Sequence, residues 1–173
     1  MKTMPDFERP EPLLRGEERA QLVSRLAHYR ATLLRKCAGL SVEELSLKPV
    51  ATSSMSLLGI LRHMTFVEQV WFDMRFTGHD VVVHYKRDDD PDADFNDLAS
   101  ATLAEVVTNF HSACQRTDEL VRGHELDELV KATGGRRDPV DLRWIYLHMI
   151  EEYARHCGHA DIFRELIDGT TGD

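Results

Sequence analysis

Residues 54–76, SMSLLGILRHMTFVEQVWFDMRF, form a long segment that is apolar almost all round when it is drawn as a helix. A surface helix has apolar residues on one face only, whereas a helix that is apolar on nearly every face is buried on most sides. We therefore expect a helix here that other elements surround. This requirement constrains the fold more than any other part of the sequence, because the surrounding elements must supply matching apolar faces.

Three further segments have the periodicity of amphipathic helices: residues 17–38, residues 102–123, and a segment that begins after Asp138 and ends at Asp168. Four helices around one core make a four-helix bundle, so we predict an all-α fold. A long connection, residues 77–101, would let the second and third helices run parallel, although the residues alone leave the directions open. Within it, residues 80–85, DVVVHY, are read as a short strand. We predict one domain over residues 1–173, with residues 1–13 as a flexible or loosely packed arm.

Short local signals mark the helix ends. Residues 41–44 and residues 102–105 read as capping boxes, which open a short helix and the third long helix. Gly78 and Gly169 follow the second and the fourth long helices as C-caps. Pro139 suits the first turn of the last helix, because its fixed backbone angle is already helical.

Charge and composition exclude several classes of function. The formal net charge of −9 argues against a nucleic-acid partner, which would need a clustered basic surface. No apolar run reaches the roughly 18 residues of a membrane span, and the first residues, MKTMPDFERPEP, contain no apolar signal-peptide core. The three cysteines, Cys37, Cys114 and Cys157, are expected to be reduced thiols that fill the core of a cytoplasmic protein.

The acidic run RDDDPDADFND begins like the calcium-binding loop of an EF-hand, with Asp90, Asp92 and Asp94. The pattern then fails, because its sixth position is Phe95 instead of glycine and its twelfth is Ala101 instead of glutamate. We therefore predict a solvated acidic loop that binds no calcium.

The last helix contains HMIEEYARHCGH, residues 148–159, with three histidines and two glutamates. On a helical wheel with His148 at zero, Glu152 falls near about 40°, His156 near about 80° and His159 near about 20°. The apolar residues of this helix lie between about 60° and 180°, so His156 faces the core and Glu152 lies at its near edge. A carboxylate aimed at a core is costly unless it is paired, protonated or metal-bound. Glu152 and His156 are also one turn apart, about 6 Å along the axis, so both can reach one ion.

A third ligand would have to come from a facing helix. His63 shares a stripe with Val67 and Met74 in the apolar segment, so it is also expected to point inward. His63, Glu152 and His156 are therefore our predicted metal ligands. The alternatives are a hydrogen-bonded core histidine at position 63 and a surface ion pair on the last helix.

The apolar segment and the last helix together resemble a known family. LLGILRHMTFVEQVWF, combined with the final HMIEEYARHCGHADIFRELIDGTTGD, is similar to the DinB-like superfamily. The closer similarity is to its actinobacterial branch, which is related to mycothiol-dependent maleylpyruvate isomerases and mycothiol transferases. The resemblance covers about residues 14–172. It implies a four-helix bundle with up-down-down-up topology and a long connection between helices two and three.

The resemblance also implies a divalent metal, held by a histidine of the second helix and two ligands four residues apart on the fourth. Carried onto this sequence, these ligands are His63, Glu152 and His156, the same residues that the wheel selects. This chain has His159 where many family members have glutamine. His159 and His148 are therefore candidates for orienting a ligand or moving a proton.

Two imidazoles and one carboxylate leave open positions on a metal, as in catalytic zinc sites, so zinc is the expected ion and nickel or iron the alternatives. A thiol bound there would be deprotonated. The resemblance implies mycothiol as that thiol, so we predict a metal-dependent thiol transferase or isomerase that acts on an electrophilic small molecule. The alternatives are a metal-dependent hydrolase or oxygenase, and a metal-binding stress or interaction protein without catalysis.

Several features of the sequence have two readings. Trp71 and Tyr153 either line a pocket beside the predicted metal or belong to the core, and their aromatic bulk favours the core. Residues 134–138, GGRRD, either receive an anionic substrate at the start of the last helix or form an exposed loop. No membrane partner is expected, and the residues leave a homodimer open.

Overall fold

The computed structural model describes residues 3–96, 98–132, 135 and 139–172. The helical elements, in chain order, are α1 (Glu18–Cys37), α2 (Val42–Leu45), α3 (Leu57–Glu68), the π-helix η1 (Gln69–Phe76), the 3₁₀-helix η2 (Leu98–Ser100), α4 (Leu103–Leu120) and α5 (Leu142–Asp168). No strand forms within these described ranges, so the prediction of an all-α fold is confirmed. The up-down-down-up order of the long helices stays a prediction.

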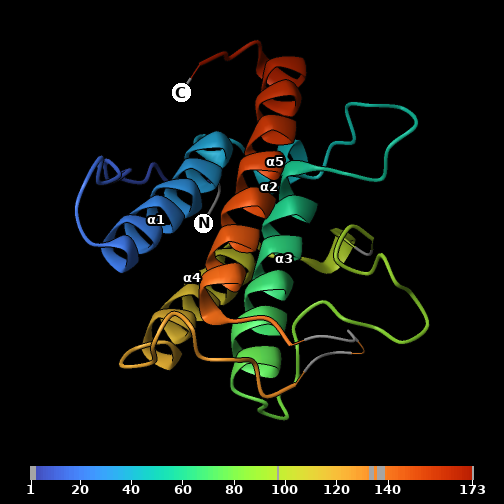
Figure 1. Cartoon of the computed structure of the whole chain (residues 1–173). Coiled ribbons are helices and arrows are strands. Elements are labelled where there is room, and N and C mark those ends of the chain that lie inside the picture. Colours follow the sequence, from blue (N-terminus) through green and yellow to red (C-terminus); the bar gives the residue numbers. More distant parts are fainter. Residues whose placement is uncertain (1–2, 97, 133–134, 136–138, 173) are drawn as a thin grey trace.

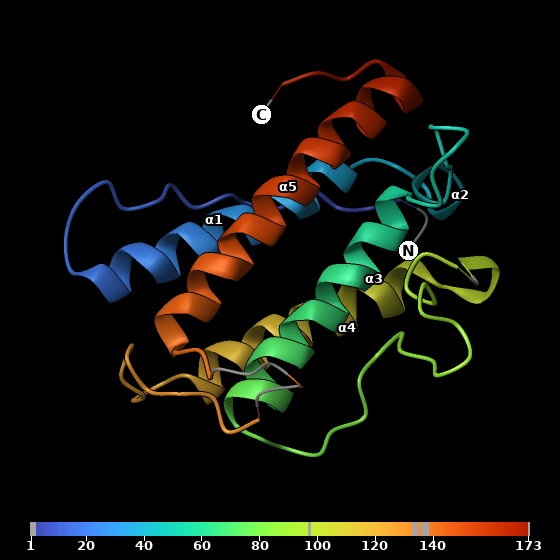
Figure 2. The same ribbon diagram turned by 45° about the vertical axis from the view of Figure 1, so that its right-hand side comes forward.

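The long helices pack in two pairs that share one core. α1 lies against α5, and α4 lies against α3 and η1 (Figure 1). α3 and α5 contact each other and run side by side across the molecule, as Figure 2 also shows. Nearly every residue of α3 is buried, as its apolar sequence predicts. The seam between α3 and α5 is therefore the place where a side chain from the second long helix can meet one from the last.

One buried carboxylate joins all four long helices. Glu68, at the end of α3, is fully buried and accepts two hydrogen bonds from Arg30 of α1, at 2.8 and 2.7 Å. The hydroxyls of Thr117 in α4 and Tyr153 in α5 each donate to it at 2.8 Å. Burial raises the pKa of Tyr153 well above its usual range, so its hydroxyl remains a donor. Tyr153 therefore belongs to the core, the second of its two predicted readings.

The segment predicted as one continuous helix over residues 54–76 changes its form directly after this carboxylate. α3 ends at Glu68, and the chain continues as a π-helix to Phe76. Single π-turns inside helices are rare and often occur at functional sites. Here the wider winding begins at Gln69, a little under two turns beyond His63, and it changes the directions of the side chains that follow.

Most predicted helix ends are correct. Ser41 and Glu44 form the complete capping box of α2, and Thr102 accepts a hydrogen bond from the backbone of Glu105 at the start of α4. Gly169, with φ 78°, is the left-handed C-cap of α5. The predicted start of the last helix near Pro139 is wrong, because its N-cap is Asp141.

The physical reason is a short extended pairing just before α5. The backbone of Val130 donates to the carbonyl of Val140 at 2.9 Å, and Leu129 forms a bridge with Asp141. Asp141, which takes part in this pairing, has an extended backbone, so the helix begins only at Leu142.

The predicted strand at residues 80–85 is also wrong. The backbone there is irregular, Val82 is 94% exposed, and Tyr85 has a positive φ of 62°. The amide of His84 donates to the side chain of Gln69, at 2.8 Å, instead of to a neighbouring strand. A strand needs a partner edge to satisfy its backbone groups, and here a helix side chain takes that place.

The N-terminal arm, residues 1–13, contacts the fold at several points in its described part, among them Leu13, whose amide donates to the hydroxyl of Ser24 at 3.0 Å, and Met4. Met4 is buried, donates its amide to the carbonyl of Leu40 at 2.8 Å and accepts from the amide of Gly39 at 2.8 Å. This anchor ties the arm to the turn after α1. In the described ranges, no helix is both long and apolar enough to cross a membrane.

Candidate metal centre

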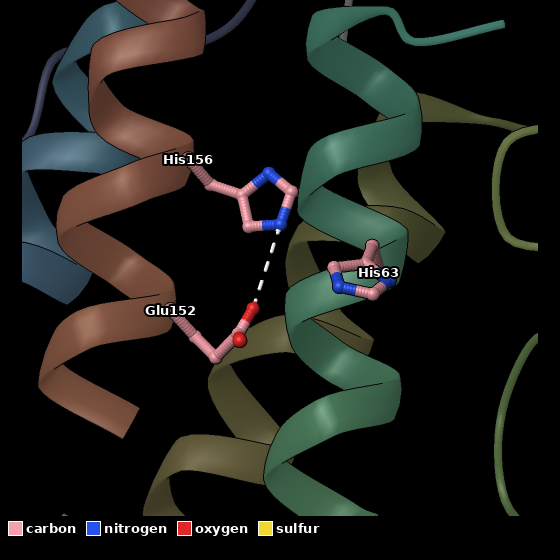
Figure 3. Close-up of side chains that lie close together, drawn as sticks. All are labelled: His63, Glu152 and His156. Carbon is pink, nitrogen blue, oxygen red and sulfur yellow. Dashed lines mark ion pairs between the residues drawn. The ribbon is translucent and has the colours of Figure 1, made fainter. Parts of the chain in front are cut away.

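His63 of α3 and the pair Glu152 and His156 of α5 face one another across the seam between the two helices (Figure 3). One potential ligand atom from each residue lies within 4.8 Å of the others. His156 is buried, and the other two are half-buried. The structure therefore brings together the three predicted ligands, with a donor set of two nitrogens and one carboxylate that suits zinc or a similar divalent ion. That they hold a metal stays a prediction.

A buried carboxylate orients His63. The Nδ1–H group of His63 donates to Oδ2 of Asp94 at 2.6 Å, and Asp94 is only 7% exposed. The ring of Phe95 stacks on the imidazole with centroids 5.2 Å apart. A proton held on Nδ1 leaves the lone pair of His63 on Nε2, the arrangement that histidine ligands of metals usually have.

Asp94 reaches His63 because its loop is fastened to α3. The guanidinium of Arg62 donates to the carbonyls of Ala93 and Asn96, both at 2.9 Å. Gly59 allows the loop to approach closely, since a Cβ atom there would lie 2.8 Å from the ring of Phe95. The prediction of a solvated acidic loop is thus wrong at Asp94, because contacts with a distant helix bury this residue. No local pattern in the sequence reveals this contact.

His156, like His63, has a neighbouring side chain next to its Nδ1 atom. Its Nδ1 lies 3.4 Å from Nδ1 of His159, whereas its Nε2 faces Oε2 of Glu152 at 3.7 Å. Burial, followed by the neighbouring imidazoles of His63 and His159, lowers the pKa of His156 to about 4. The ring is therefore neutral at pH 7, as a ligand must be. The carboxylate of Glu152 pairs with Arg155 through its other oxygen, Oε1, at 2.6 Å.

The two additional candidate histidines have different places. His159 contacts the ligand His156. His148 instead stacks on Trp144, with ring centroids 4.9 Å apart. It also makes a T-shaped contact with Trp71, with ring centroids 4.5 Å apart. Trp71 is 7% exposed, so it belongs largely to the core. The basic stretch at 134–138 falls outside the described residues, apart from one glycine.

The thiols of the protein are poor nucleophiles. Cys37, Cys114 and Cys157 are free and buried, as predicted. Burial raises the pKa of Cys37 and of Cys157 to about 12 and also raises that of Cys114. Because the thiolate is the reactive form, none of the three can supply a nucleophile near pH 7.

Comparison with known proteins identifies the family of the chain. The chain is similar in fold to the crystal structure of a conserved protein from Enterococcus faecalis, with a TM-score of 0.62 and 12% identity over 90% of this chain and all of that one. At that identity the likeness concerns the fold alone. No curated protein matches the chain in sequence. The model of the mycothiol-S-transferase family matches residues 21–169, a range that contains all three converging residues. The chain therefore belongs to the mycothiol-S-transferase family.

Proposed function

We propose that this protein transfers a low-molecular-weight thiol, mycothiol, to an electrophilic small molecule at a divalent metal held by His63, Glu152 and His156. The family supports thiol transfer as the reaction class. The convergence of the three side chains from two helices is the observation that carries the proposal. The buried, protonated cysteines support it further, because the protein has no thiolate of its own to offer.

When bound, the metal would lower the pKa of a thiol and stabilise its thiolate. Zinc suits the two-nitrogen, one-oxygen set, and nickel or iron are the alternatives. In the transfer, the thiol gives up its proton to solvent, its sulfur forms a bond to the electrophilic carbon, and the leaving group departs with the bonding electrons.

The residues of the chain prepare the site for this reaction. Asp94 and His159 each occupy the Nδ1 side of one histidine, which leaves Nε2 of His63 and of His156 for a metal, and Nε2 of His156 faces Glu152. This arrangement gives His159 a positioning role. The free, buried cysteines also fit a reducing compartment, and we infer that the protein works in the cytoplasm.

The direct test is formation of a thiol conjugate. Metal-loaded protein, mycothiol and 1-chloro-2,4-dinitrobenzene are expected to yield the conjugate faster than the same mixture without protein, as measured by absorbance and mass spectrometry. Cysteine in place of mycothiol serves as the control for thiol selectivity. A fully metallated sample that accelerates conjugation of no electrophile in a panel would contradict the proposal. Bound iron, with oxygen consumption, would instead favour the oxygenase alternative.

Replacing Asp94 by alanine tests the orientation of His63. We expect metal affinity to fall by about 10- to 100-fold, because the imidazole loses the carboxylate that holds its tautomer and ring direction. Affinity is measured by competition with a chelator, and helicity by circular dichroism. Asp89→Ala is the matched control, since Asp89 lies in the same loop but is exposed and pairs only with Arg87 in the described structure. Equal affinities of Asp94→Ala and Asp89→Ala would show that Asp94 has no positioning role.

A further inference from the structure

A groove runs along α3 and η1, beginning beside the metal centre. It consists of two neighbouring hollows of about 140 and 430 Å³ that share Phe66 and Lys86. Asp94, the partner of His63, lines the smaller hollow. The larger one has the volume of a typical small-molecule site. None of the three predicted metal ligands lines either hollow, so the groove is a neighbouring space and not the metal centre itself.

The floor of the groove is an apolar stripe that continues the face of His63. Phe66, Val70 and Met74 follow His63 at steps of three and four residues, and each is only half-buried. From the rise of a helix, this stripe extends roughly 15 Å from His63 along the axis. An apolar stripe that the fold leaves uncovered, in a concave place, is suited to an apolar ligand.

The rim of the larger hollow is positively charged. Arg75 and Lys86 line it, against one carboxylate, Asp80, and the remaining titratable group is His79, which is bonded to Asp73. The guanidinium of Arg75 lies over the ring of Trp71, 4.3 Å from its centroid. The larger hollow alone therefore has two cations against one carboxylate, on a chain whose net charge is −9, whereas Arg87 in the smaller hollow is matched by Asp90 and Asp94. This contrast favours a ligand with a negative charge.

We propose that this groove binds the electrophile and selects molecules with an apolar body and an anionic end, such as a carboxylate. The body would lie on Phe66, Val70 and Met74, and the anionic group would meet Lys86 and Arg75. The reactive end would then point along the stripe toward His63, on whose Nε2 side the metal would hold the thiol. This assignment rests on the proposed thiol transfer, for which it names the class of the second reactant.

The test compares two unreactive probes of nearly equal size and shape, 3,5-dinitrobenzoate and its neutral counterpart 3,5-dinitrobenzamide, by calorimetric titration. The wild-type protein is expected to bind the benzoate about tenfold more tightly, as one charge-assisted contact would give. Lys86→Glu should abolish this difference, and Met74→Gln should weaken both probes. Lys48→Glu makes the same charge change at an exposed position outside the groove and should behave as the wild type.

Equal affinity for the two probes, or a benzoate affinity that Lys86→Glu leaves unchanged, would overturn the assignment. His63→Ala separates it from the proposed function. This variant should still bind the benzoate as the wild type does, although it binds no metal and transfers no thiol. Transfer without selective benzoate binding would thus refute the groove alone, whereas benzoate binding without transfer would refute the proposed reaction and leave the groove in place.

Discussion

The His156→Ala variant is expected to bind divalent metal at least about 100-fold more weakly than the wild-type protein and to show no thiol transfer. Only His63 and Glu152 would remain, and the wild-type site has no fourth protein ligand within the described cluster. The apo protein should keep its helical content, because the neutral ring of His156 makes no strong ion pair there. Metal content after dialysis and titration against a chelating dye measure the loss.

Two glutamates supply the matched comparison for this result. Glu152 and Glu151 are neighbours on α5, but Glu152 faces His156 whereas Glu151 is exposed. Glu152→Ala should therefore resemble His156→Ala, and Glu151→Ala should bind metal as the wild type does. Added zinc should raise the melting temperature of the wild type and of Glu151→Ala only, since a ligand stabilises the state that binds it. Full metal binding by His156→Ala would refute the predicted centre.

The second large effect is expected on stability. Glu68→Ala should lower the free energy of unfolding of the apo protein by about 3–5 kcal/mol, because it leaves the buried guanidinium of Arg30 without its two-point partner. Tyr153 and Thr117 would lose their acceptor in the same change. Urea unfolding followed by circular dichroism measures the difference.

Asp118 provides the control, because it also pairs with Arg30, at 2.9 Å, but is 57% exposed. Asp118→Ala should cost no more than about 1 kcal/mol, as exposed ion pairs do. Replacing both buried partners, as Arg30→Met with Glu68→Leu, should recover part of the loss of Glu68→Ala, since no buried charge is then left unpaired. If Glu68→Ala and Asp118→Ala unfold at the same urea concentration, the buried network contributes no more than a surface pair.

Much of the candidate site could be predicted from periodicity. A helix repeats every 3.6 residues, so the spacing of Glu152 and His156 already places both on one face, and the stripe of His63 points it inward. The same periodicity predicts the long helices to within a few residues at most ends. It also predicts that α3 is buried, because a helix that is apolar on nearly every face has few other environments.

The partners that orient and stabilise these residues could not be predicted in this way. Asp94 lies 31 residues from His63, and Arg30 lies 38 residues from Glu68. The acidic run around Asp94 has the composition of a solvated loop, and its burial depends on Arg62 and Gly59 of another element. Glu68 is one of two carboxylates in a largely apolar segment, and the groups that compensate its buried charge come from three other helices.

The sequence by itself therefore determined the all-α class, the approximate helices and the faces that carry His63, Glu152 and His156. A face is a local property, because it follows from residue spacing within one helix. The tertiary structure alone decided the π-helix after Glu68, the late start of α5 at Leu142, the irregular backbone at residues 80–85 and the pairing of Asp94 with His63. The last three of these depend on which distant backbone or side-chain group satisfies a hydrogen bond, and that partner is chosen only when the helices pack.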